Sequence, residues 1–345
     1  NRECDNCHGN EELFLTADKV QPEVRRANQS IIVPKEMIPE KQNRDKPDTE
    51  KPPHSYFPAA GASTEAVFVK AAQVAEWIEN KEQKLQVIDC RLEEKSYLAG
   101  HVPGAIYFDV STKLLVKGPW DTVGVRQRLE AQEELFGRQL GISKDTMVIL
   151  YDDSGESATR LFWELKYAGH DKVALLFGSW PEWQAEKLPV EKKANKVVPA
   201  LFVAEIQQQL LATSSSILAS MENPDVVLLD ARPPKEFKGD AKHPAAKIGG
   251  HIPNAVNAFA MVNWKHNTYP KDPDLLLQMY ADLGVTPDKE IVVYCNTGIY
   301  AANTYFILKA LGFPNVRVYD YSLSLIHISE PTRLLSISYA VFCLK

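Results

Sequence analysis

Cys295 has the sequence setting of a nucleophile. The β-branched run 291–294 (IVVY) predicts a buried strand that ends directly before it. The turn-prone triplet 296–298 follows, and over 301–311 the apolar spacing becomes helical, with Gly312 placed as the C-terminal cap. A thiol between a strand and a helix faces free backbone amides and the positive end of the helix dipole, which both favour the thiolate. Cys295 is therefore expected to be reactive, and the alternative is an ordinary buried cysteine.

The same construction occurs twice in the chain. Residues 148–169 repeat the pattern of 291–312 at an offset of 143 residues, which sets Asp152 opposite Cys295. Two further motifs are also duplicated, a D-x-R sequence and a G-H-[VI]-P turn. They occupy 89–91 and 230–232, and 100–103 and 250–253, respectively. An internal duplication of this length predicts two domains of the same fold.

In this order, and twice over, the three motifs resemble those of a tandem rhodanese-type sulfurtransferase of the thiosulfate and 3-mercaptopyruvate sulfurtransferase family. The resemblance covers about residues 67–321. It implies an α/β fold of two tandem rhodanese-like domains, and the alternation of predicted strands and helices favours parallel sheets with helices on both faces. In that family the N-terminal repeat lacks the cysteine, and Asp152 opposite Cys295 matches that division.

The resemblance implies a reaction at Cys295. Its thiolate would take sulfane sulfur from a donor such as thiosulfate or 3-mercaptopyruvate as a persulfide, and cyanide or a thiol would then remove that sulfur. The backbone amides of the following loop would hold the developing negative charge, so sulfur transfer needs no cofactor. The loop residues expected to bind substrate are Asn296, Thr297, Gly298, Ile299, Tyr300 and Ala301.

The loop departs from the best-known family members, so the sulfur donor is left open. Asn296 and Thr297 are uncharged, whereas thiosulfate-preferring members tend to carry basic residues there. Glu236 stands where two-domain members often have an arginine for the substrate anion. Arg232 and Lys247 are the cationic side chains expected to take that role, with Lys247 first because it lies closest to the Gly-Gly-His turn. Further cations nearby in sequence are Lys235, Lys238 and Lys242.

Other duplicated residues are expected to be structural. Arg91 should pair with Asp89 or with a neighbouring carboxylate, which would fix the loop at the end of its strand. His101 and His251 should hydrogen-bond the backbone in their turns. Cys90 should be a small buried apolar residue, because Ala231 occupies the matching position of the second repeat.

The coarse secondary structure follows from periodicity. We predict helices over 71–80 and 203–211, and strands over 85–88 and 226–229. The segment 178–183 (GSWPEW) is expected to be an aromatic-rich turn that packs over the sheet edge.

We expect an inactive rhodanese-like domain at 67–190 and a catalytic one at 198–321. The run LSLIHISEPTR at 323–333 resembles translated sequencing-library adapter. Residues 322–345 are therefore expected to be a non-native tail that truncates the catalytic domain.

The N-terminal motif C-x-x-C-H predicts a c-type haem. Cys4 and Cys7 have the spacing for two thioether bonds, and His8 would be an iron ligand. The alternatives are a chance match, part of a zinc site or a disulfide. Residues 1–41 resemble the end of a multihaem c-type cytochrome, and 42–66, rich in Lys, Asp, Asn and Pro, is expected to be a linker.

The haem motif bears on location and on function. Because c-type haem is attached outside the cytoplasm, the resemblance implies a periplasmic protein, or a cytoplasmic one if the motif binds no haem. The chain begins with Asn1, and we expect it to be a fragment. An alternative function is a haem-linked electron-transfer or sulfur-relay protein, with a redox partner, whose rhodanese-like domains carry sulfur without turnover.

Several other classes are disfavoured. A phosphatase or arsenate reductase would need Cys-x5-Arg, but the sixth residue after Cys295 is Ala301. The net charge of -6 argues against a nucleic-acid partner, and no apolar run reaches the length of a membrane span. A composition of 45% hydrophobic and 24% charged residues is that of an ordinary globular protein.

Overall fold

The computed structural model of the protein describes residues 67–81, 84–116, 125–221, 223–244, 249–266 and 268–320. All of these belong to one compact unit, residues 55–345. Several predictions fall outside the described residues and stay predictions. They concern the haem motif at Cys4, Cys7 and His8, the linker at 42–66, Lys247 and the tail at 322–345.

The first repeat is built on a five-stranded sheet in which all neighbours are parallel. Its order is β1 (Phe68–Val69), β7 (Val173–Leu176), β6 (Met147–Tyr151), β2 (Leu85–Asp89) and β3 (Ile106–Tyr107). Its helices are α1 (Ala71–Asn80), α2 (Glu94–Ala99), α3 (Val110–Lys113), α4 (Leu129–Glu134), the π-turn Leu135–Gln139, α5 (Ser157–Tyr167) and α6 (Ser179–Ala185). The strands β4 (Leu115–Val116) and β5 (Val125–Arg126) form a separate antiparallel pair.

The second repeat has a four-stranded parallel sheet of the same design. Its order is β13 (Val316–Val318), β12 (Glu290–Tyr294), β8 (Val226–Asp230) and β9 (Val256–Asn257). Its helices are α7 (Ser214–Ser220), α8 (Pro234–Lys238), α9 (Pro273–Asp282) and α10 (Ile299–Ala310), with 3-10 turns at Gln208–Leu210 and Ala260–Asn263. The pair β10 (Trp264–Lys265) and β11 (Tyr269–Pro270) forms a small hairpin. Two tandem α/β domains with parallel sheets were predicted, and this architecture confirms them.

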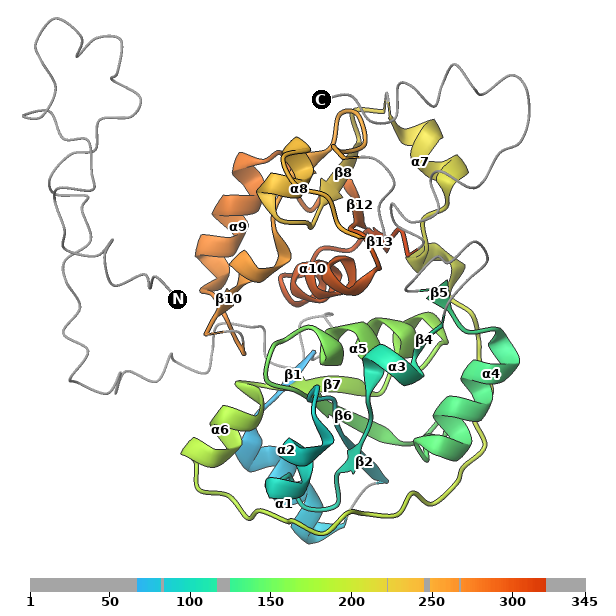
Figure 1. The fold of residues 1–345 in the computed structure, drawn as a ribbon, viewed down its shortest axis with the longest axis vertical. Helices are drawn as coiled ribbons and strands as arrows, with labels where there is room; N and C mark the ends of the chain where they lie inside the picture. Colours follow the sequence, from blue (N-terminus) through green and yellow to red (C-terminus); the bar gives the residue numbers. More distant parts are fainter. Residues whose placement is uncertain are drawn as a thin grey trace, which may run out of the picture. The chain divides into compact units, whose positions relative to one another are not determined.

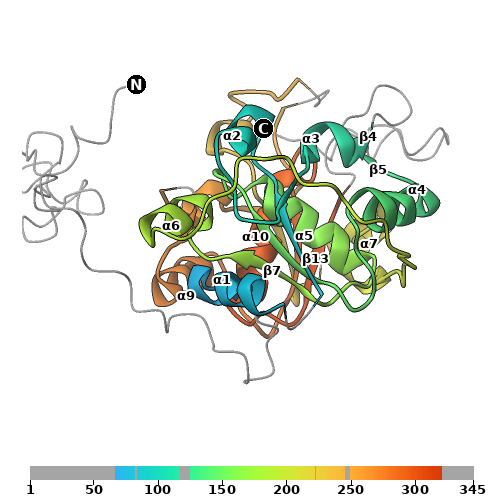
Figure 2. The same ribbon diagram turned by 90° about the horizontal axis from the view of Figure 1, so that it is seen from below.

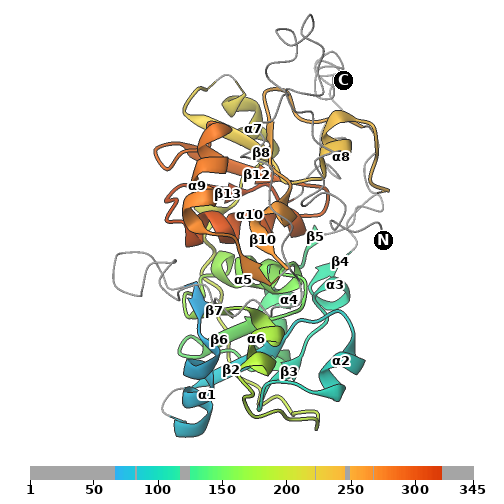
Figure 3. The ribbon, with the colours of Figure 1, turned by 90° about the vertical axis from the view of Figure 1, so that its left-hand side faces the viewer.

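The helices α5 and α10 face each other between the two sheets, as Figures 1 and 3 show. One continuous apolar core therefore joins the repeats. At its centre Phe306 of α10 packs edge-on against Phe162 of α5 and against Phe68, with ring centroids 4.9 Å apart in both pairs. Aromatic burial of this kind is a large hydrophobic contribution, so the repeats should be held together mainly by these two helices.

A smaller apolar cluster lies on the opposite face of each sheet. In the first repeat α1 and α6 cover that face (Figure 2), with Val74 and Trp183 fully buried. In the second repeat Ile217 of α7 contributes to the corresponding cluster. Helices on both faces explain why β6 and β12 are almost continuously apolar. Within the described part of the chain, no helix is long and apolar enough to cross a membrane.

Of the five elements predicted away from Cys295 and its counterpart Asp152, three are confirmed and two are wrong. The helix at 71–80 and the strands at 85–88 and 226–229 are present as α1, β2 and β8. In place of the predicted helix at 203–211, residues 203–207 have no regular secondary structure and the 3-10 turn Gln208–Leu210 follows them. Two backbone amides of this segment, those of Glu205 and Gln207, donate to Ala168 and Tyr167 at the end of α5, at 2.9 and 2.8 Å. Docking against the first repeat therefore replaces the helical hydrogen bonds.

The second incorrect element is the segment 178–183, which we predicted to be a turn. Gly178 adopts a left-handed conformation (φ 66°) and begins α6, and Trp183 is fully buried under the sheet. The helix forms because its aromatic side packs into the outer cluster of the first repeat.

Candidate active site

Cys295 directly follows the end of β12, and three residues separate it from the start of α10. The strand β12 lies between β13 and β8, so Cys295 follows an interior strand of the sheet. Cys295 is only 1% exposed. The backbone N–H of Gly298 donates to Cys295 Sγ at 3.0 Å. Gly298 has a φ of 83°, in the left-handed region that favours glycine, and this turn aims its N–H at the sulfur. The predicted order of strand, cysteine, loop and helix is confirmed.

The side chains of the loop have distinct surroundings. The amide of Asn296 is buried and its Nδ2 donates to Glu236 Oε2 of α8 at 2.7 Å. Thr297, Ile299 and Tyr300 are half-buried. The remaining predicted loop residue, Ala301, is fully buried in the core between the repeats. The half-buried side chains therefore form the outer side of the loop.

In the equivalent loop of the first repeat, backbone N–H groups surround the carboxylate of Asp152. We call the N–H groups that face the side chain at this position the cradle of the loop. Asp152 accepts hydrogen bonds from the backbone N–H groups of Ser154, Gly155 and Ala158, at 3.3, 2.8 and 3.0 Å. At the offset of 143 residues, the matching donors beside Cys295 are the N–H groups of Thr297, Gly298 and Ala301. The carboxylate oxygens of an aspartate stand one bond beyond the position of a cysteine Sγ. The outer sulfur of a cysteine persulfide would stand the same number of bonds along the side chain.

Burial and the amide hydrogen bonds shift the pKa of the Asp152 carboxyl in opposite directions. Desolvation raises the pKa of its carboxyl to about 6, although the N–H groups of Ala158, Gly155 and Ser154 act in the other direction. Burial also raises the pKa of the Cys90 thiol well above its usual range, and the nearby Asp152 and Asp89 raise it further. Cys90 is 1% exposed, which confirms it as a buried small residue with no sign of an activated thiol.

The D-x-R pairs are structural in both repeats. Arg232 donates from Nε and Nη2 to both carboxylate oxygens of Asp230, and from Nη2 to the Gly250 carbonyl at 2.7 Å. Arg91 holds Asp89 and the Gly100 carbonyl in the same way. Arg232 is 1% exposed. The expectation that it binds the anion of the donor is therefore corrected, because its bidentate edge is already occupied by Asp230.

The turn histidines also behave as predicted. His101 Nδ1 lies 2.7 Å from the Tyr97 carbonyl oxygen, and His251 Nδ1 lies 2.8 Å from that of Phe237. Each imidazole also stacks on the ring of the same residue. Both histidines are therefore parts of the turns that follow α2 and α8.

The structure places acidic side chains near the outer side of the loop. Burial raises the pKa of Tyr300, and the charges of Glu156, Cys295 and Glu236 raise it further. Of the predicted cations, Lys235 and Lys238 lie exposed on α8, the helix that carries Glu236. Sequence reasoning missed Glu156, which comes from the first repeat at the position opposite Ile299. A position-by-position comparison of the two duplicated loops could have identified Glu156 as a candidate.

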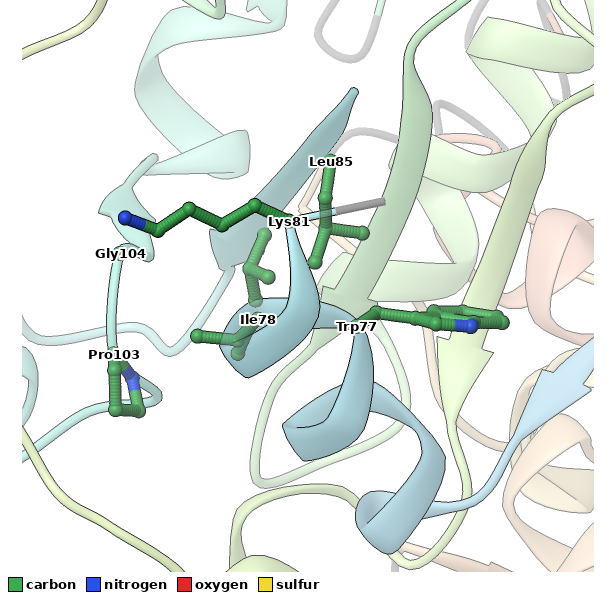
Figure 4. A pocket seen from close by; sticks show the side chains of 7 residues that line it. Trp77, Ile78, Lys81, Leu85, Pro103 and Gly104 are labelled. Atoms are coloured by element: carbon green, nitrogen blue, oxygen red, sulfur yellow. The ribbon is translucent and has the colours of Figure 1, made fainter. Parts of the chain in front are cut away.

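A surface hollow of about 200 Å³ opens elsewhere, in the first repeat between α1 and the G-H-V-P turn (Figure 4). Trp77, Ile78, Lys81 and Pro103 are among the residues that line it. None of its lining residues belongs to the loop after Cys295, so this hollow does not serve the cysteine. Among the described residues, no cluster of His, Cys, Asp and Glu could hold a metal ion.

A profile of the family described as "Rhodanese-like domain" matches residues 70–186 and 213–328. The chain belongs to this family. The two matched segments correspond to the two repeats of the structure, so the cysteine and the aspartate stand in equivalent loops of two rhodanese-like domains.

Named relatives support sulfane sulfur transfer. The thiosulfate sulfurtransferase of Azotobacter vinelandii is 35% identical over 231 residues, which are 65% of this chain and 81% of that protein. The sulfur carrier protein TtuD of Thermus thermophilus is 32% identical over 267 residues, or 72% of this chain and 90% of that protein. The crystal structure of SseA, a 3-mercaptopyruvate sulfotransferase from Escherichia coli, superimposes with a TM-score of 0.65 at 29% identity, covering 74% of this chain and 98% of that one.

The charge at Glu236 should limit the use of anionic donors. Replacing Glu236 by Arg should raise kcat/KM for thiosulfate about tenfold, mainly through a lower KM, because a repulsive charge beside the loop becomes attractive. Steady-state kinetics at two ionic strengths would measure this. Glu236→Gln is the control, since it keeps an acceptor for Asn296 and should give a smaller gain. An unchanged kcat/KM in a folded Glu236→Arg protein would refute this account.

The raised pKa of Asp152 predicts a pH dependence of stability. Between its ordinary pKa of about 3.9 and its folded value of about 6, the folded state binds more protons than the unfolded state. Stability should therefore fall as the pH rises from 4 to 7, and Asp152→Asn should remove about 2 to 3 kcal/mol of that fall. Urea unfolding across this range measures it. The exposed Asp145→Asn variant should keep the dependence of the wild type.

Proposed function

We propose that this chain is a sulfurtransferase that moves sulfane sulfur from a small donor, such as thiosulfate or 3-mercaptopyruvate, to cyanide or a thiol through a persulfide on Cys295. One observation carries the assignment of the site. The equivalent loop of the first repeat holds the two oxygens of Asp152 on three backbone N–H groups. The same loop at Cys295 begins with the Gly298 N–H donating to the sulfur. This supports a cradle for a negatively charged outer sulfur.

The first half-reaction is a displacement at sulfur. The Cys295 thiol gives its proton to solvent, and Sγ attacks the outer sulfur of the donor. With thiosulfate, the new S–S bond forms as the old one breaks, and sulfite leaves with the bonding electron pair. The negative charge then resides on the outer sulfur of the persulfide. The N–H groups at the start of α10 would stabilise it there.

The second half-reaction returns the cysteine. The acceptor attacks the outer sulfur, and Cys295 Sγ leaves with the electron pair of the S–S bond. With cyanide the product is thiocyanate, and with a thiol it is a persulfide of the acceptor. Neither half requires a residue to act as acid or base beyond solvent. Lys247 stays the candidate cation for the donor's anion.

A sulfur-relay function is the second candidate. It is favoured by the likeness to a relative named as a sulfur carrier protein. A relay protein would accept sulfur on Cys295 from a partner protein and pass it on, without turnover of free thiosulfate or 3-mercaptopyruvate.

The decisive experiment replaces Cys295, whose Sγ is proposed to carry the transferred sulfur. Cys295→Ser should lower thiocyanate formation from thiosulfate and cyanide at least 100-fold, because no persulfide can form. Cys90→Ala is the matched control, since it only reproduces the residue found at the equivalent Ala231, and it should retain activity. Mass spectrometry of the donor-treated wild type should show one added sulfur on Cys295. Sulfur on Cys295 without turnover would favour the relay function, and activity without Cys295 would refute both.

We further propose that the N-terminal motif binds haem c through Cys4 and Cys7, with His8 as an iron ligand, in a periplasmic protein that has a redox partner. The support is the C-x-x-C-H spacing alone. A pyridine haemochrome spectrum of the exported protein should show c-type haem, and Cys4→Ser/Cys7→Ser should abolish it. A wild type without this spectrum would refute the haem site and favour the cytoplasmic location.

A further inference from the structure

A buried ion pair joins the two repeats. Arg160 of α5 places Nη1 2.5 Å from Oδ1 of Asp320, which follows β13 in the second repeat. The two side chains are 0% and 1% exposed. Arg160 Nη2 also donates to Glu164 Oε1 on its own helix at 2.5 Å. Two carboxylates therefore fix the guanidinium from opposite repeats.

This ion pair lies against the glycine of the catalytic loop. A Cβ atom placed on Gly298 would overlap Arg160 Nη1 and Asp320 Oδ1. The backbone of Gly298 is therefore packed directly on the charged pair. Its N–H is the group that donates to Cys295 Sγ. A change at Arg160 would thus be transmitted to this hydrogen bond through one residue.

The contact has a counterpart of different chemistry in the inert loop. At the offset of 143 residues, Asn303 of α10 is opposite Arg160, and Gly155 is opposite Gly298. Asn303 Nδ2 donates to the Gly155 carbonyl at 2.5 Å, while its Oδ1 accepts from Trp264 Nε1 at 2.8 Å. Each central helix therefore reaches across to the loop glycine of the other repeat. The neutral amide meets the inert loop, and the guanidinium meets the catalytic one.

We infer that Arg160 is a positioning residue for sulfur transfer, supplied by the repeat that lacks the cysteine. With Asp320 it holds Gly298 so that the N–H stays directed at Cys295 Sγ. The inference rests on the proposed function of Cys295. It assigns the inert repeat a part in the reaction besides packing, because the loop is braced from outside its own domain.

The test separates positioning from stability. Arg160→Gln should lower kcat for sulfur transfer 10- to 100-fold and change KM less than threefold. Iodoacetamide should also alkylate Cys295 more slowly at neutral pH, with the midpoint of its pH profile shifted upward. Asn303→Ala is the matched control, since it removes the mirror-image contact. It should lower the thermal midpoint yet leave kcat and the alkylation profile within twofold of the wild type.

A second variant covers the case in which Arg160→Gln does not fold. The double variant Arg160→Gln/Asp320→Asn removes both charges of the inter-repeat pair, so no carboxylate of Asp320 is left unpaired. It should fold and still show the slower alkylation. A folded double variant with wild-type kcat and alkylation would overturn the inference, as would an equal loss in Asn303→Ala. The alkylation rate requires no turnover, so it reports on Arg160 even if the proposed sulfurtransferase activity fails.

Discussion

The site depends on backbone amides that take the place of water around a buried polar side chain at the end of a strand. Asp152 and Cys295 are 2% and 1% exposed, so neither can be hydrated as it would be at the surface. The donors come from the loop and from the first turn of α5 or α10, where helical N–H groups have no partner within the helix. The left-handed glycine in each loop serves to aim these donors.

The cradles of the two repeats are equivalent in backbone but hold different side chains. Aspartate fills the first of them with its own oxygens, which already occupy the three N–H groups of the first loop. Cysteine is shorter by one bond, so a persulfide on Cys295 would place its outer sulfur at the position that the oxygens take in aspartate, counted in bonds along the side chain. In the first repeat the equivalent loop therefore holds a carboxylate where the second repeat holds a thiol. The first repeat then contributes packing and Arg160 to the loop that does react.

The local sequence pattern was enough to predict the elements that surround Cys295 in the second repeat. The strand, cysteine, loop and helix around Cys295 follow from periodicity and turn residues, and the duplication identified Asp152 as its counterpart. The predictions that were wrong depended on tertiary contacts. The segment 203–211 loses its helix to carbonyls of α5, and Arg232 is taken up by Asp230 two residues away. The pair of Arg160 and Asp320 was not foreseen, because nothing local indicates that equivalent helices reach across to each other's loops.

The charges around the loop suggest what it recognises. Arg160 and Arg232, the two buried guanidinium groups beside it, are each held by carboxylates, and Glu236 bonds directly to Asn296. Within the part of the chain that the structure describes, the favourable potential for an anionic sulfur therefore comes mainly from backbone dipoles, whose effect falls off within one helical turn. The potential of these backbone dipoles acts on an atom that already lies in the cradle, and it attracts a distant anion only weakly. The loop is thus suited to select the position of the transferred sulfur, whereas the total charge of the donor is read by the side chains outside it.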